Sequence, residues 1–119
     1  MGMSQKAKGA RGERLWAAEC QKAGFTGVHR VGQQQYQTGA EVPDVDGLDG
    51  VHIECKFVEK LNLRRAMEQS EHDAEEEGRG NVPIVAHKTS RKPWLVTMLG
   101  KDWLEFYRAW KNSRLELDF

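Results

Sequence analysis

Apolar and polar residues alternate most regularly in the middle of the chain, from Val51 to Val58. One face of the strand that this alternation predicts carries Val51, Ile53, Cys55 and Phe57, and the other carries His52, Glu54, Lys56 and Val58. Upstream, residues 44–47 predict a partner strand, and Leu48-Asp49-Gly50 predicts a short hairpin loop. With a three-residue loop, Val45 pairs with Ile53 on the core face. Asp44 then lies opposite Glu54 on the other face, with Cβ atoms about 5 Å apart.

Helical periodicity appears on both sides of this hairpin. A first helix is predicted from about Ala10, with a buried stripe and Gly24 as its C-terminal cap; the stripe is Trp16, Cys20 and Ala23. A second helix is predicted between Asn62 as N-cap and Gly78; its apolar stripe is Leu63, Ala66, Met67, Ser70 and Ala74.

The C-terminal third predicts two further strands and a third helix. Residues 81–88 and 93–99 are apolar runs joined by a basic turn. Asp102 is expected to open the helix, with Glu105 in the capping-box position. An aromatic stripe on this helix either packs against the protein's own sheet or faces a partner; it consists of Trp103, Phe106, Tyr107 and Trp110.

A further strand is expected over residues 27–32, whereas two segments are expected to lack regular structure. Residues 1–8 have no periodic apolar positions and predict a flexible basic arm. Residues 33–42 are too polar to bury and predict a mobile loop, in which Tyr36 either packs locally, as loop tyrosines more often do, or stacks on an unpaired base. At 119 residues the chain is expected to form one domain, 1–119.

Composition excludes several classes of protein. No apolar run approaches the length of a membrane span, and the polar, basic start is unlike a secretory signal. Cys20 and Cys55 lie far apart on predicted apolar faces, so we expect reduced core thiols in a cytoplasmic protein. They match neither a zinc-ligand spacing nor a redox Cys-x-x-Cys motif.

The formal net charge is zero, but the charges are segregated along the sequence. Such a chain can present one basic and one acidic face, although solvated surface charge is an equally good interpretation of the pattern alone. Three groups are basic and one is acidic: Lys6, Lys8, Arg11 and Arg14; Lys60, Arg64 and Arg65; Lys88, Arg91 and Lys92; and, against them, Glu71, Asp73, Glu75, Glu76 and Glu77.

The predicted pairing of Asp44 with Glu54 is a poor structural choice by itself. Two carboxylates at this separation repel by about 3 kcal/mol at an effective dielectric constant near 20. A divalent cation would turn that repulsion into a binding site. Glu13 continues the inward stripe of the first helix at its first turn, where a carboxylate suits the helix dipole but not an apolar core.

Pro43-Asp44 followed by Glu54-Cys55-Lys56 resembles the signature of the PD-(D/E)xK nuclease superfamily. The segment from Lys8-Gly9 to Glu13-Arg14 resembles the opening of archaeal Holliday-junction resolvases and their phage-borne relatives. The resemblance implies a restriction-endonuclease-like α/β (mixed α+β) fold, in which helices flank a mixed central sheet.

The same resemblance implies the site residues and the partners. Glu13, Asp44 and Glu54 would hold Mg²⁺, with Mn²⁺ able to substitute, and Lys56 would orient or activate water. The implied DNA contacts are Lys8, Arg11, Arg14 and Arg30, and Gln69 is a weaker candidate near the acids. The expected activity is resolution of four-way DNA junctions by a homodimer in the cytoplasm, that of a host if the protein is phage-encoded.

Two alternatives stay open. The nearer is the same chemistry on other branched DNA or on plain duplex. The more distant is a catalytically silent DNA-binding module, which the presence of all four site residues disfavours.

Overall fold

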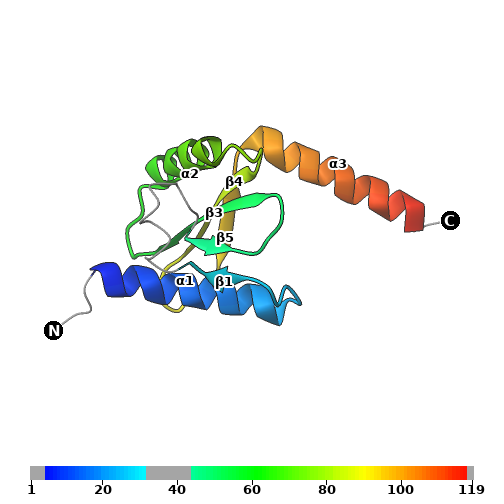
Figure 1. Cartoon of the computed structure of the whole chain (residues 1–119). Coiled ribbons are helices and arrows are strands. Elements are labelled where there is room, and N and C mark those ends of the chain that lie inside the picture. Colours follow the sequence, from blue (N-terminus) through cyan, green and yellow to red (C-terminus); the bar gives the residue numbers. More distant parts are fainter. Residues whose placement is uncertain (1–4, 32–43, 118–119) are drawn as a thin grey trace.

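The computed structural model describes residues 5–31 and 44–117. Its core is a five-stranded mixed sheet in the order β1-β2-β3-β4-β5, with α1 packed on one face and α2 on the other (Figure 1). The elements are α1 (Gln5–Lys22), β1 (His29–Arg30), β2 (Val45–Asp46), β3 (Val51–Phe57), α2 (Leu63–Glu77), β4 (Val82–Lys88), β5 (Leu95–Met98) and α3 (Gly100–Leu117). This is the α+β, restriction-endonuclease-like fold that the sequence predicted.

The register of the central hairpin is the predicted one. Val45 pairs with Ile53 across the antiparallel β2–β3 ladder, and both side chains are fully buried. On its other side β3 runs parallel to β4, so β3 is the central strand of the sheet. Both faces of a strand in this position are covered, which explains why His52 and Glu54 are as buried as the apolar residues that alternate with them.

Separate apolar clusters lie on the two faces of the sheet. On the α1 side, Trp16 is part of the larger cluster with Ile53 and packs against Trp94 with ring centroids 5.1 Å apart. On the α2 side, Ala66 and Met67 pack around Val85. Cys20 and Cys55 are buried free thiols, as predicted.

A glycine allows α1 to approach the end of β3 closely. A Cβ atom added at Gly12 would lie 2.5 Å from the Cβ of Phe57, well inside van der Waals contact. The next residue on the helix is Glu13. The close packing of α1 on β3 therefore fixes where this glutamate lies relative to the strand.

The second helix has the predicted ends. The side chain of Asn62 accepts a hydrogen bond from the backbone N–H of Arg65 at 3.1 Å, and Gly78 ends α2 in a left-handed conformation with φ 68°. Buried Ser70 donates its hydroxyl to the Ile84 carbonyl at 2.9 Å. This bond fixes α2 over β4.

Several boundaries differ from the prediction. The helix α1 begins at Gln5, so residues 5–8 are helical rather than part of an arm, because glutamine, lysine and alanine favour helix without any buried stripe. Ala23 follows the end of α1 and is exposed. The third helix begins at Gly100, which puts Asp102 inside its first turn. Three parts of the chain lie outside the described residues: residues 1–4, the predicted loop with Tyr36, and Pro43.

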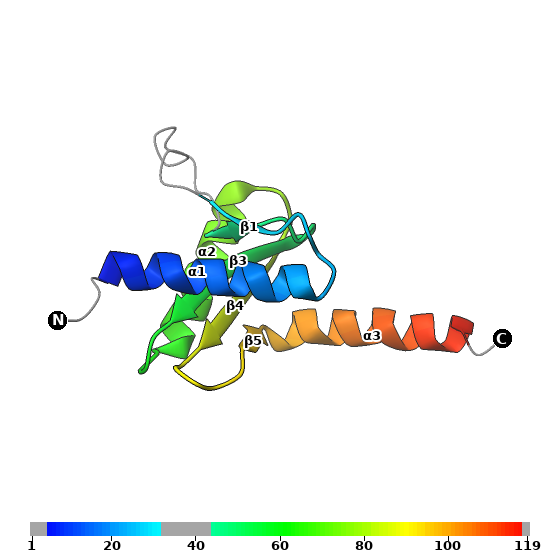
Figure 2. The same cartoon turned by 90° about the horizontal axis from the view of Figure 1, so that it is seen from below.

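The third helix projects away from the sheet (Figure 2). Its aromatic stripe is exposed, so the alternative in which the stripe packs against its own sheet is wrong; the exposed fractions are Trp103 53%, Phe106 49%, Tyr107 43% and Trp110 57%. Among the described residues, none of the helices is both long and apolar enough to span a membrane.

Candidate active site

Asp44 lies directly before β2, at the end of that strand away from the hairpin loop. Because Val45 pairs with Ile53, the preceding Asp44 is brought opposite Glu54, as the sequence predicted. The backbone N–H of Cys55 donates a hydrogen bond to Asp44 Oδ2 at 3.3 Å. The carboxylate of Asp44 is therefore tied to the central strand as well as to its own.

Glu54 is buried on the α2 face of the same strand, with 7% of its surface exposed. Burial and, after it, the negative charge of Asp44 raise the pKa of Glu54 from the ordinary value of 4.5 to about 7. Lys56 opposes this shift, since its Nζ lies 3.4 Å from Glu54 Oε1. The lysine is less buried, with 38% of its side chain exposed, so its ammonium group reaches the surface beside the acids.

Glu13 reaches this group from α1. Its Oε1 accepts a hydrogen bond from Arg30 Nε at 2.8 Å. Burial raises the pKa of Glu13, the charge of Asp44 adds to the rise, and Arg30 lowers it. The pKa of Asp44 is itself raised by burial. Glu13, Asp44 and Glu54 thus form one electrostatically coupled group of carboxylates.

Arg30 has a partner that the sequence did not indicate. Its Nε is engaged by Glu13, and 29% of its side chain is exposed. The contact gives Arg30 a positioning role toward Glu13, in addition to the phosphate contact expected for its remaining nitrogens.

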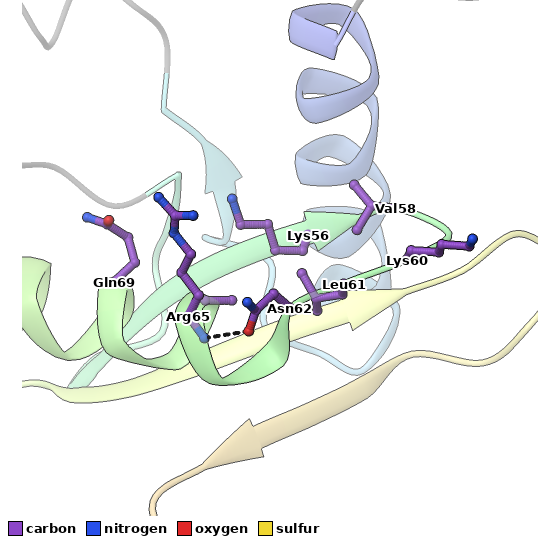
Figure 3. Close-up of a pocket in the computed structure, with 8 residues that line it drawn as sticks. Lys56, Val58, Lys60, Leu61, Asn62, Arg65 and Gln69 are labelled. Atoms are coloured by element: carbon purple, nitrogen blue, oxygen red, sulfur yellow. Dashed lines mark hydrogen bonds between the residues drawn. The ribbon is translucent and has the colours of Figure 1, made fainter.

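A basic pocket adjoins Lys56, with a volume of about 300 Å³. Figure 3 shows Lys56, Arg65 and Gln69 extending their side chains in the same direction from β3 and α2. The amide of Gln69 also donates a hydrogen bond to Asp73 Oδ1 at 2.9 Å. The full lining is Lys56, Val58, Lys60, Leu61, Asn62, Arg65, Ala66 and Gln69. Three cations around one depression favour an anionic ligand such as a phosphate.

A second basic pocket, of about 390 Å³, contains two of the expected DNA contacts, Lys8 and Arg11. Phe57 forms its apolar wall, and the guanidinium of Arg11 and the ammonium of Lys88 lie 5.8 and 5.6 Å from the centre of that ring. Arg14 is exposed, and its charge lowers the pKa of Glu13.

Sequence reasoning missed residues on the α2 side of the site. Arg65 and Lys60 belong to a basic group in the sequence, but only the fold shows that they surround Lys56. His52 and Asp73 lie close to Glu54. The sequence indicates these two residues only by their positions. His52 precedes Glu54 by two residues and so shares its strand face, and Asp73 follows Gln69 by one helical turn.

The carboxylate group has the chemistry of a site for a hard divalent cation. Glu13, Asp44 and Glu54 offer anionic oxygens, which Mg²⁺ and Mn²⁺ prefer. Their raised pKa values show that the folded chain holds these charges at an electrostatic cost. A bound cation would offset that cost, so these oxygens fit such an ion by their chemistry. Their spacing is wider than that of His52, Glu54 and Asp73, which among the described residues are the group whose ligand atoms all lie within 4.8 Å of one another.

No family model and no curated protein matches the chain. Among solved structures, it is similar to Hjc, a Holliday junction resolvase from the archaeal hyperthermophile Archaeoglobus fulgidus. The two chains are 30% identical, the similarity covers 76% of this chain and 72% of Hjc, and the TM-score is 0.53. The chain belongs to the PD-(D/E)xK nuclease superfamily, among its resolvase-like members.

Proposed function

We propose that this protein is a metal-dependent DNA endonuclease that resolves four-way (Holliday) junctions. The observation that carries the proposal is the electrostatic coupling of buried Glu54 with half-buried Asp44, and of Asp44 with half-buried Glu13, beside the ammonium of Lys56, on a chain similar to Hjc. We expect it to act in the cytoplasm, where it meets its DNA.

Glu13, Asp44 and Glu54 would hold Mg²⁺, and Mn²⁺ would substitute. Such an ion supplies Lewis-acid chemistry, activating water and stabilising the charge that develops on the phosphate. Lys56 donates to the attacking water from its position beside Glu54. The N–H of Cys55 holds Asp44 in place, and Arg30 holds Glu13. These contacts preorganise the acids before DNA binds.

The two basic pockets would bind the DNA backbone next to the acids. Lys60 lines both pockets, so the cations form one continuous surface from Arg65 to Lys8 and Arg11. Contacts of lysine and arginine with phosphates position the DNA without reading its sequence. This surface therefore suits a substrate that is recognised by shape.

Symmetric cleavage of a junction requires two active sites, and thus a two-fold dimer. The exposed apolar arc of α3 supports a second copy of this chain as the occupant of that surface. Its members are Trp103, Leu104, Phe106, Tyr107, Trp110 and Leu115. With aromatic side chains of 150–250 Å² exposed by roughly half, the arc presents on the order of 500 Å². Stable dimers bury about 800 Å² per partner, so α3 would supply much of the interface.

A two-fold axis allows the two copies of α3 to pack antiparallel. Antiparallel packing opposes the two helix dipoles, which favours this arrangement over a parallel one.

A cleavage assay separates this function from its rivals. We expect the purified protein to cut a labelled four-way junction with Mg²⁺ and to leave a linear duplex of equal length intact. Equal cutting of junction and duplex would favour the same chemistry on other DNA. Junction binding without cutting under any divalent ion would favour the silent DNA-binding module.

A further inference from the structure

His52 is a buried histidine on the central strand and lacks a satisfactory hydrogen bond. It is 1% exposed, and within the described residues neither ring nitrogen makes a hydrogen bond. Its Nδ1 lies 3.1 Å from Glu77 Oε1, but the two groups are not aligned for hydrogen bonding, and this oxygen is also buried without a partner. Buried polar atoms of this kind are uncommon and costly, and they call for an explanation.

The surroundings of His52 supply ligands for a metal ion. Ligand atoms of His52, Glu54 and Asp73 all lie within 4.8 Å of one another. Ligand atoms on one tetrahedral ion with bonds of 2.0–2.2 Å lie roughly 3.5 Å apart. Small side-chain movements would therefore bring the three ligand atoms to the spacing that an ion requires. Asp73 projects from α2, so the ion would join this helix to the central strand.

Glu77 behind His52 strengthens the assignment. Metal-bound histidines usually donate their second ring N–H to a carboxylate, which fixes the tautomer and the orientation of the ring. Since Nδ1 faces Glu77, Nε2 is the nitrogen left for an ion. Binding would bring His52 and Glu77 into a hydrogen-bonded pair, and it would give partners to both ring nitrogens of His52 and to Glu77 Oε1.

We propose that His52, Glu54 and Asp73 form a second divalent-cation site, which binds a borderline transition ion such as Co²⁺ or Zn²⁺. An imidazole nitrogen among two carboxylates suits these ions better than it suits Mg²⁺ or Ca²⁺. Three protein ligands leave further coordination positions open to water. The site needs no DNA and does not include Asp44 or Glu13. It shares Glu54 with the proposed nuclease centre, so ions at the two sites would influence each other's affinity.

Co²⁺ is the probe for the test, because it reports its ligands directly. The full chain, without DNA, is titrated with CoCl₂ and followed by visible absorption and by NMR. We expect a paramagnetically shifted, exchangeable ring N–H signal from one bound histidine. Asp73→Asn should weaken the Co²⁺ affinity of this site by about tenfold or more and remove the signal. His52→Gln should remove it as well, which assigns it.

Matched variants distinguish this site from the nuclease centre. Glu75→Gln makes the same change of charge on an exposed position of α2 and should leave the signal unchanged. Asp44→Asn should abolish DNA cleavage but keep the histidine signal. The second site is excluded if Asp73→Asn binds Co²⁺ with wild-type affinity, or if the ion reports no histidine ligand. Asp73 is only half-buried, so its variant tests the site even if the His52 variant does not fold.

Discussion

Glu54→Gln should stabilise the metal-free protein, although it removes an active-site residue. Glu54 is buried beside Asp44, and both factors raise its pKa to about 7. At neutral and alkaline pH the folded chain must therefore hold an ionised carboxylate in a position that disfavours the charge. Glutamine has nearly the same shape and carries no charge, so the variant avoids this cost.

The magnitude follows from the difference between the folded and unfolded pKa values. The folded protein retains a proton on Glu54 up to a pH of about 7, whereas the unfolded chain loses it near 4.5. The folded state binds more protons between these values, so this carboxyl lowers the free energy of unfolding as the pH rises through the window. The full cost above pH 7 is about 3 kcal/mol, and at pH 5 less than about 1 kcal/mol remains.

Thermal unfolding in EDTA at pH 8 and pH 5 measures this difference. After allowance for the lost contact with Lys56, we expect a gain of about 2 kcal/mol at pH 8, or about 8 °C in Tm for a domain of this size. The gain should nearly vanish at pH 5, and Mg²⁺ should stabilise the wild type much more than the variant. Glu75→Gln, an exposed change on α2, is the control and should leave Tm unchanged at both values of pH. A variant that melts at or below the wild-type temperature at pH 8 would refute the reasoning.

Three further predictions concern the packing around the site and the dimer. Gly12→Ala should lower the free energy of unfolding in a denaturant titration by about 1–3 kcal/mol, because the new Cβ would overlap Phe57. It should also slow cleavage, because it displaces Glu13. Gly9→Ala is the control: its Cβ would have no atom nearer than 4.0 Å, so the same titration should show no loss of stability. Cys55→Ser should lower the free energy of unfolding by about 1–3 kcal/mol through burial of a hydroxyl, with cleavage retained by the folded fraction; lost cleavage at unchanged Tm would contradict the observed strand face. In sedimentation experiments at micromolar concentration, Tyr107→Asp should convert the dimer into a monomer. Ala109→Asp lies on the other side of α3 and should leave the dimer intact. A monomeric wild type would exclude the α3 dimer.

Local sequence patterns were sufficient for the central hairpin. Strict alternation fixes which residues share a face, and a three-residue loop between valine-bearing strands permits one register, so Asp44 was correctly placed opposite Glu54. Capping residues gave both ends of α2 for the same local reason.

Long-range packing lies outside the reach of such patterns. β4 pairs with β3, and α2 covers the polar face of the sheet. This packing buries His52 and brings Asp73 to Glu54, but no residue near His52 in the sequence indicates it. The contact between Arg30 and Glu13 likewise joins two elements that are distant in the sequence. An aromatic stripe such as that of α3 has the same periodicity whether it packs against its own core or faces outward.

Cleavage of a fixed four-way junction tests the central claim most directly. Wild-type protein with Mg²⁺ and a junction labelled on each strand in turn should produce paired nicks in two opposite strands, and the products should religate into linear duplexes. Asp44→Asn should produce no nicks while it binds the junction in Ca²⁺ nearly as tightly as the wild type, because phosphate contacts supply most of the affinity. Nicking by Asp44→Asn at close to the wild-type rate, or a wild type that binds the junction and never cuts it, would contradict the assignment.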